Sequence, residues 1–242
     1  STGVPGNVLV LSEGSTDGLA GRLVEFVGRL VPHSREQLAN IDWGALAMSL
    51  VATFQMVLIG TAAAIVLSWP LSALAATNVG PRYVRGPIRL LLNMIRAVPS
   101  IIWALLFVCA VGLGPVAGVL ALVAYSIGYL TKFFYEAFEA ADPGPQGALK
   151  EIGASGPQCL LHAVWPASRA PVLSSCVFML EYNVRAASVL GVVGAGGIGY
   201  DLKLHIEYGN YHVVGVIIIM LIVVVELMDR VSRYLRAKMV QG

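Results

Sequence analysis

Charged residues are scarce in this sequence of 242 residues, of which 12% are Asp, Glu, Lys or Arg and 57% are hydrophobic. A soluble domain has about twice that charged share. The few charges are also unevenly spread, because none falls within residues 43–81, 97–131 or 208–225. A membrane core about 30 Å thick needs roughly 20 apolar residues in a helix. The scarcity therefore excludes a soluble, secreted or disordered protein and predicts a membrane-spanning one, and a net charge of +2 gives no indication of nucleic-acid binding.

Signatures of several other protein classes are absent from the sequence. The three cysteines, an odd number, argue against a framework of disulfides. The four histidines are scattered without the spacing of metal ligands, and the loops offer no nucleophile with a base beside it, so we expect neither a metal site nor an enzyme. No G-x-x-x-x-G-K-[ST] motif occurs, so the chain supplies no P-loop ATPase of its own. Energy for active transport would have to come from a partner or an ion gradient.

The N-terminal residues 1–42 are polar and are expected to form an extracytoplasmic or interfacial segment. They begin with Ser1 rather than Met, so we expect the natural chain to start further upstream. Apolar residues recur at helical spacing over 19–31, which predicts a helix lying in the membrane interface. The rest of the chain, 43–242, is expected to be the transmembrane domain.

Five membrane spans are predicted within that domain. Pro70 is expected to kink the first span near its end, and Gly86 and Pro87 are expected to break the chain before the second. A cluster of charged residues at the end of the last span predicts an interfacial anchor. The spans are placed at about 45–76, 88–111, 116–140, 166–193 and 211–228.

The basic residues predict the orientation of these spans, because loops rich in Lys and Arg remain in the cytoplasm. If the loop after the first span is cytoplasmic, eight basic residues lie on that side and one, Lys203, lies on the other. This assignment places the loop at about 141–165 and the C-terminus in the cytoplasm. The eight residues are Arg82, Arg85, Arg89, Lys150, Arg230, Arg233, Arg236 and Lys238.

The loop at 141–165 carries the capping signals of two short helices. Asp142 is a good N-cap and is followed by Pro143 at the first helical position. Gly153 supplies the left-handed residue that ends this helix. Ser155 and Gln158 form a capping box that opens the next helix. Capping alone is compatible with a plain turn between two spans.

The loop also contains Gly153, Ala154, Ser155, Gln158 and Pro166. Together these residues resemble the signature loop of ABC importer permeases. The sequence at 181–199 is similar to the phosphonate branch of that family in particular. The resemblance covers roughly residues 45–238.

This resemblance implies an all-α membrane protein with the type I ABC importer permease core of five transmembrane helices, preceded by an N-terminal interfacial helix. It also implies a second copy of the chain, two ABC ATPase subunits that receive the loop as a coupling element, and an extracytoplasmic solute-binding protein for phosphonate or phosphate. ATP and magnesium would be bound by the ATPase subunits, with no cofactor in this chain. The family usually has Glu where this chain has Gly147, although Ala148 fits, and Lys150 or Glu151 would supply a substitute contact.

Gly194, Gly196 and Gly199 match the pattern G-x-G-x-x-G of dinucleotide-binding proteins. That motif needs a strand, a helix and an acidic residue about 20 positions further on, where this chain has Ile219 within an apolar run. We therefore expect these glycines and Gly197 to allow close helix packing. In the resembling family this segment lies near the outer mouth of the translocation pathway.

Charged and polar residues within the predicted spans are candidates for the pathway, because such residues rarely face lipid. Glu181 and Arg185 lie on one helical face and can neutralise each other. One interpretation is an ion pair that fixes helix packing. The other is that Arg185, with Asn183 and Arg96, lines a route for an anion. Arg96 can also extend its charge to the membrane interface.

We therefore expect the transmembrane subunit of an ATP-driven importer for phosphonate or a related phosphorus oxyanion, resident in the cell membrane. An importer for methionine or another small solute is an alternative within the same class. An ion-coupled secondary transporter that uses Glu181 and Arg185 belongs to a different class, as does a membrane scaffold without transport activity. The sequence contains no inverted repeat that would favour the secondary transporter.

Overall fold

A computed structural model describes residues 16–32, 38–39 and 41–241, and within these ranges every regular element is helical. Ser1 and one of the four histidines, His33, lie outside these ranges. The helices are α1 (Thr16–Leu30), α3 (Trp43–Ala75), α4 (Arg82–Ala97), α5 (Ser100–Val111), α6 (Pro115–Glu139), α7 (Pro143–Glu151), α8 (Gly156–Cys159), α9 (Trp165–Leu190), α10 (Ile198–Glu207) and α11 (Tyr211–Gln241), with π-helical segments η1 (Leu160–Val164) before α9 and η2 (Gly191–Ala195) after it.

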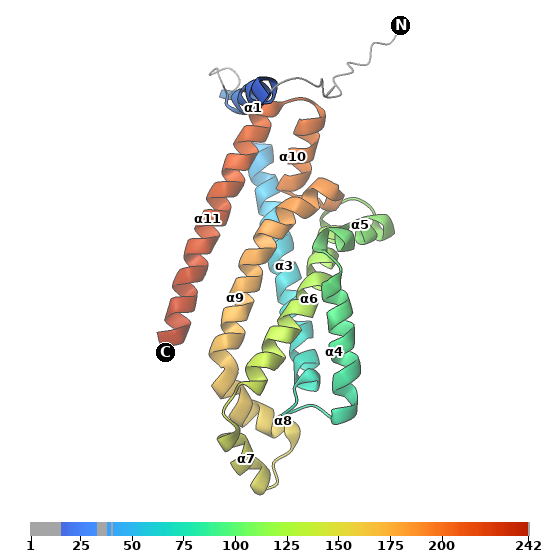
Figure 1. The fold of residues 1–242 in the computed structure, drawn as a ribbon, viewed down its shortest axis with the longest axis vertical. Coiled ribbons are helices and arrows are strands. Elements are labelled where there is room, and N and C mark those ends of the chain that lie inside the picture. Colours follow the sequence, from blue (N-terminus) through green and yellow to red (C-terminus); the bar gives the residue numbers. More distant parts are fainter. Residues whose placement is uncertain (1–15, 33–37, 40, 242) are drawn as a thin grey trace.

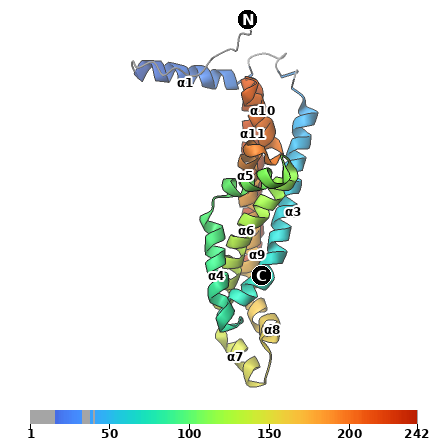
Figure 2. The same cartoon turned by 90° about the vertical axis from the view of Figure 1, so that its right-hand side faces the viewer.

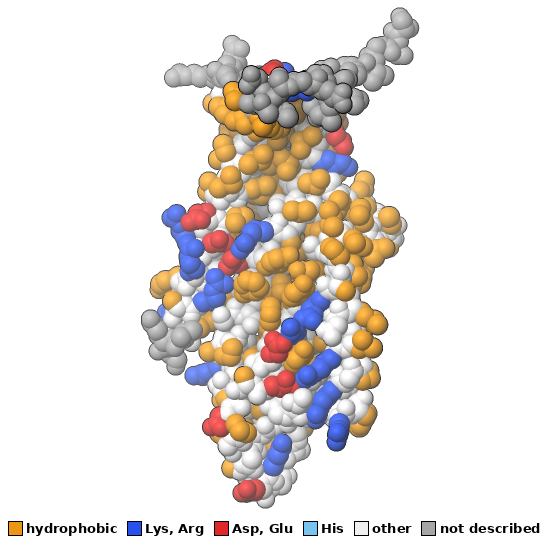
Figure 3. Space-filling view, viewed as in Figure 1, with side chains coloured by type: hydrophobic (Ala, Val, Ile, Leu, Met, Phe, Trp, Pro, Cys, Tyr) orange, Lys and Arg blue, Asp and Glu red, His pale blue; other side chains and the backbone are white. Residues whose placement is uncertain are grey.

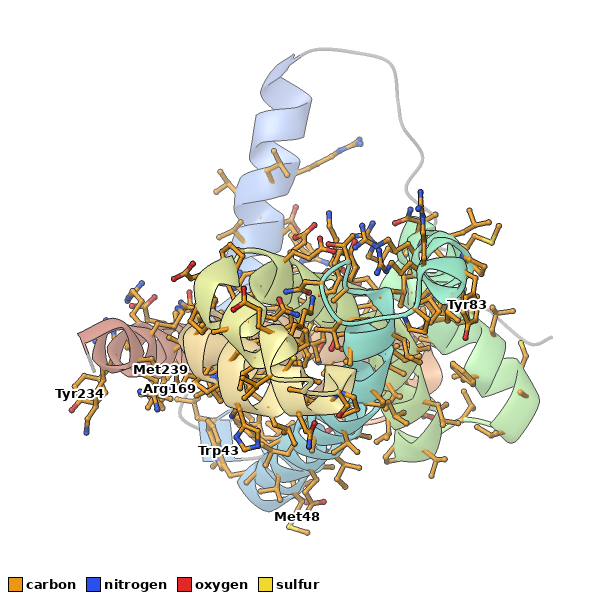
Figure 4. All side chains as sticks on the ribbon, turned by 90° about the horizontal axis from the view of Figure 1, so that it is seen from below. Trp43, Met48, Tyr83, Arg169, Tyr234 and Met239 are labelled. Carbon is orange, nitrogen blue, oxygen red and sulfur yellow. The ribbon has the colours of Figure 1, made fainter. Side chains whose placement is uncertain are left out.

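The long helices form an elongated bundle in which α3, α6 and α9 occupy the centre (Figure 1). Helix α4 flanks α6, and α11 flanks α9 on the other side of the bundle. Viewed from the α7 end, Tyr83 of α4 and Tyr234 of α11 point away from the bundle (Figure 4), and these side chains are 82% and 69% exposed. Helix α1 lies across the opposite end, nearly perpendicular to the bundle axis (Figure 2). The bundle thus has a loop end, formed by α7 and α8, and an α1 end.

Small residues and aromatic rings fill the centre of the bundle. A Cβ at Gly60 of α3 would lie 3.0 Å from Leu122 of α6, so this glycine permits close helix contact. Nearer the loop end, the ring of Trp69 packs edge-on against Phe138 at 5.6 Å and against Trp165 at 4.6 Å. These contacts join α3, α6 and the start of α9 into one core.

Four of the five predicted spans are confirmed as long apolar helices. The remaining one, the predicted second span, is a bent pair of helices. The span expected at about 88–111 corresponds to parts of α4 and α5, which meet at an angle of 88°. The cause is Pro99, which lacks an N–H donor and forces Val98 into an extended conformation at φ −90° and ψ 120°. Gly86 and Pro87 do not break the chain as expected, since both lie within α4. Both lie in its second turn, and because Pro87 has no N–H, the carbonyl of Tyr83 lacks its usual helical donor while the helix continues.

The helix expected over 19–31 is confirmed as α1. Its Phe26 packs edge-on against Tyr211 at the start of α11, with the ring centroids 5.9 Å apart. A Cβ at Gly215 would collide with the backbone of Leu30, so this glycine lets α1 approach α11 closely. Helix α10, between the fourth and fifth spans, was not anticipated from the sequence.

Candidate functional site

The capping signals of the loop at 141–165 are confirmed. Asp142 Oδ1 accepts a hydrogen bond from the backbone of Gly144 at 3.0 Å at the start of α7. Gly153 has φ +82° and turns the chain between α7 and α8. Gln158 Oε1 accepts from the backbone N–H of Ser155 at 2.7 Å, as a capping box requires. Two short helices with a glycine corner therefore project from the end of the bundle.

Most of the residues proposed for coupling face outward from this end. Ala154 is partly buried, and the other candidates are exposed. The tip also carries an apolar side chain that the sequence analysis missed, because Ile152 is 80% exposed. A large apolar residue in that position is available to a partner protein. The exposed candidates are Ala148, Lys150, Glu151, Gly153, Ser155, Gln158 and Pro166.

One side chain of α7 points inward and ties the loop to the bundle. Gln146 is 5% exposed, and its Nε2 donates a hydrogen bond to the backbone carbonyl of Asn78 at 2.6 Å. Asn78 in turn donates from Nδ2 to the carbonyl of Phe138 at 2.7 Å. The turn between α3 and α4 thus connects α7 to the end of α6. Nothing in the local sequence around Gln146 indicates this contact.

Glu139, the last residue of α6, joins the same turn to α4. Its carboxylate accepts a hydrogen bond from the backbone N–H of Thr77 at 2.6 Å and forms an ion pair with Arg89. Arg89 also donates to the carbonyl of Ala75 from Nε at 3.0 Å and from Nη2 at 2.9 Å. Displacement of α7 would therefore act on α3, α4 and α6 together.

Glu181 and Arg185 form the expected ion pair within α9, and α11 contributes two further charges. Arg236 Nη2 lies 3.1 Å from Glu181 Oε2, and Arg185 Nη2 lies 3.4 Å from Asp229 Oδ1. Two carboxylates and two guanidinium groups thus balance each other between α9 and α11. Asp229, part of the interfacial anchor expected at the end of the last span, makes an exposed contact with Arg185 of α9, and the anchor stays a prediction. A groove of about 470 Å³ opens beside Glu181 and Arg236.

Asn183, a pathway candidate, is fully buried within the chain itself. Its Nδ2 donates to Thr61 Oγ1 of α3 and to Ser126 Oγ of α6, both at 2.9 Å. These bonds link the three central helices, as buried polar networks do in membrane bundles. The position therefore fits a packing role.

Arg96 lies in the last turn of α4, directly before the bend to α5. Its Nη2 donates to Asn93 Oδ1 at 2.6 Å, and its Cζ lies 5.8 Å from the centre of the Tyr129 ring. Since α4 begins at Arg82 rather than near residue 88, Arg96 lies about 21 Å along the helix from its start. The side chain is thus further from the loop end than the sequence suggested.

The glycine cluster makes a compact turn where α9 leaves the bundle. The carbonyl of Gly194 accepts a hydrogen bond from the N–H of Gly114 at 2.9 Å, and Gly194 has φ +98°. A Cβ at Gly199 would collide with the carbonyl oxygen of Ser188. Gly196 and Gly197 complete this turn. Within the described ranges no strand precedes the glycines, so the context of a dinucleotide-binding motif is missing.

Comparisons with known proteins agree with this architecture. The family model of binding-protein-dependent transport system inner membrane components matches residues 68–241. The phosphate-import permease protein PhnE of Mycolicibacterium smegmatis is 39% identical over 213 residues, which are 88% of this chain and 39% of that protein. The phosphite transport system permease protein PtxC of Stutzerimonas stutzeri is 42% identical over 188 residues, 77% of this chain and 68% of that protein. This chain thus spans about two fifths and two thirds of these relatives.

A more distant relative carries another substrate in its name. The probable D-methionine transport system permease protein MetI of Pasteurella multocida is 25% identical over 208 residues, 80% of this chain and 94% of that protein. Among solved structures, a chain of the MetNI methionine ABC transporter in inward-facing conformations matches with a TM-score of 0.72 and 18% identity, over 81% of this chain and 97% of that one. The structural likeness supports the fold alone.

Proposed function

Because the chain belongs to the family of binding-protein-dependent transport system inner membrane components, we propose that it is the membrane-spanning subunit of an ATP-driven importer for phosphonate or a related phosphorus oxyanion. The observation that carries this proposal is the identity of 39% and 42% to permeases whose names specify phosphate and phosphite. The relative named for D-methionine is 25% identical, so methionine is the second candidate substrate. Mutual pairing of Glu181 and Arg185 leaves no free carboxylate there for an ion-coupled transporter.

The proposed importer contains a second copy of this chain, two ABC ATPase subunits and an extracytoplasmic solute-binding protein. ATP and magnesium are bound by the ATPase subunits. The loop of α7 and α8 is the coupling element, since it projects from one end of the bundle and is tied to α3, α4 and α6 through Gln146. The basic residues that favour a cytoplasmic loop and C-terminus support an orientation in which the α1 end is outside.

Coupling follows from the geometry of the loop. When the ATPase subunits close on ATP, the loop helix bound to them is displaced. The displacement reaches the bundle through the hydrogen bonds of Gln146 and Asn78. Ile152 is the apolar contact that this loop offers to the ATPase, flanked by Glu151. Alternating access would then arise from movement of the α3–α4 turn relative to α9.

The experiment that tests the substrate is uptake by proteoliposomes that contain this chain, its cognate ATPase and its binding protein. ATP-dependent uptake of radiolabelled phosphate, phosphite or methylphosphonate supports the proposal. Tight binding of methionine to the binding protein, with none of these anions bound, would reject it. Uptake that persists without ATP and collapses with the ion gradient would favour a secondary transporter.

The docking surface is tested separately by co-purification with the ATPase. We expect Ile152→Asp to lower recovery of the complex at least about tenfold, because an ionised carboxylate would replace a buried apolar contact. Ile206→Asp is the matched control, since Ile206 lies in α10 near the opposite end and is 47% exposed. Equal recovery of the two variants would show that Ile152 does not contact the ATPase.

A further inference from the structure

Arg96 differs from Arg185 and Arg236 in its charge balance. Arg185 and Arg236 share Glu181 and Asp229, so that group of four is neutral. In the described part of the chain, Arg96 forms no ion pair, and its polar contact is the neutral side chain of Asn93. A guanidinium remains charged at every physiological pH. Its charge is therefore free to interact with a mobile anion.

Several hydrogen-bond donors at Arg96 and Asn93 also have no acceptor among the described residues. The guanidinium has five N–H donors, of which one reaches Asn93. Its Nε is enclosed and has no acceptor among the described residues. Because Asn93 accepts this bond through Oδ1, its Nδ2 group is turned to other acceptors, and the Asn93 side chain is exposed. The ring of Tyr129 bounds the site on the α6 side.

The position of Arg96 also suits an anion in transit. It ends a row of arginines along α4, and basic side chains follow that edge of the molecule in Figure 3. Arg85 is committed to the carbonyl of Gly80 at 2.6 and 2.9 Å, and Arg89 to Glu139. A row of cations raises the local concentration of anions. Arg96 lies where this row meets the 88° bend between α4 and α5.

We propose that Arg96 and Asn93 form a transient binding site for the transported oxyanion at the bend between α4 and α5, a site that rests on the proposed function. A tetrahedral phosphorus oxyanion has oxygens spaced for two parallel N–H bonds from a guanidinium, and the amide of Asn93 supplies a further donor. The carbonyl end of α4 offsets part of the arginine charge and keeps the site weak enough to release the anion. The neutral cluster around Glu181 then holds α9 and α11 together, while Arg96 contacts the substrate.

The test uses the complete importer in proteoliposomes and the anion, among phosphate, phosphite and methylphosphonate, that the wild-type complex takes up. Asn93→Asp preserves the shape of the side chain and places a carboxylate beside Arg96, where it would compete with the substrate. We expect the uptake rate at saturating binding protein to fall about tenfold, with complex assembly and thermal stability unchanged or higher. Arg96→Gln should lose uptake to a similar degree, and Arg96→Lys should retain part of it. Arg230→Gln is the control, because Arg230 pairs with Glu226 on an exposed face.

Unchanged uptake by Asn93→Asp would overturn the proposal, since an arginine that only caps α4 or reaches the membrane interface gains from a carboxylate neighbour. Loss of assembly in both Asn93→Asp and Arg96→Gln would assign the pair a structural role and would also overturn it. If the wild-type complex takes up none of the three anions, the proposed function fails and the binding site with it. Wild-type uptake combined with unaltered variants rejects the binding site alone.

Discussion

The side-chain amide of Gln146, in the projecting loop, donates a hydrogen bond of 2.6 Å to the backbone carbonyl of Asn78 in the turn between α3 and α4. The two residues are 68 positions apart in the chain. Gln146 is 5% exposed, so water does not readily replace this bond. The contact makes the loop part of the bundle rather than a flexible attachment to it.

Substitution of Gln146 by Ala should weaken coupling between ATP hydrolysis and transport. Loss of the bond costs about 1 kcal/mol and leaves the partly buried carbonyl of Asn78 without its donor, while the outer surface of α7 is unchanged. We therefore expect normal binding of the ATPase and fewer substrate molecules transported per ATP hydrolysed. Gly147→Ala is the neighbouring control, because a Cβ there meets no atom within 4 Å. Equal ratios of transport to hydrolysis in the two variants would contradict a coupling role for Gln146.

Gly153→Ala should destabilise the corner of the loop. The residue has φ +82°, a conformation that costs an L-residue with a Cβ about 1 to 2 kcal/mol. We expect a comparable loss in affinity for the ATPase, about fivefold to thirtyfold by titration of the purified subunits. Gly153→Asn should be milder, since Asn tolerates this conformation better than Ala. If the Asn variant binds as weakly as the Ala variant, the loss comes from a clash between the added side chain and the ATPase rather than from backbone strain.

The elements that could be predicted from the sequence are those with local signals. Runs of apolar residues locate α3, α6, α9 and α11, and the capping residues Asp142, Gly153 and Ser155 define the loop. Each of these signals lies within one continuous stretch of the sequence, from a few residues at a cap to about 20 in an apolar run. These signals can therefore be recognised without knowledge of the tertiary structure.

The features that could not be predicted depend on contacts between distant segments. Gln146 and Asn78 have no shared local pattern, and Arg236 reaches Glu181 only because α11 packs beside α9. The bend at Pro99 was missed because the length of an apolar run does not show whether the helix axis changes direction within it. Of the pathway candidates, Asn183 lies in the core, a placement that depends on how three helices are rotated about their axes.

Glu181→Gln should distinguish a packing network from a transport route. Glu181 is largely buried and contacts Arg185 and Arg236, so its neutralisation leaves two cations with reduced compensation. We expect a loss of about 1 to 3 kcal/mol in stability, measured by thermal unfolding of the purified protein in detergent. Glu226→Gln, which affects an exposed pair, should cost less than about 1 kcal/mol. A Glu181 variant with wild-type stability and altered uptake would place this cluster on the transport route instead.

Gly199→Ala should disrupt the turn that returns the chain from α9 to α10. A Cβ at this position would collide with the carbonyl oxygen of Ser188, and the Cα of Gly191 would lie 3.0 Å away. Both neighbours are backbone atoms, so relief requires displacement of a helix rather than a side-chain rotation, and we expect a loss of about 1 to 3 kcal/mol in thermal unfolding. Gly86→Ala should instead be neutral or stabilising by about 0.5 to 1 kcal/mol, because its Cβ would meet open space within α4. Since the loop of α7 lies at the far end of the bundle, binding of the ATPase should be retained by Gly199→Ala; an equal loss of binding would mean that the two ends of the bundle unfold together.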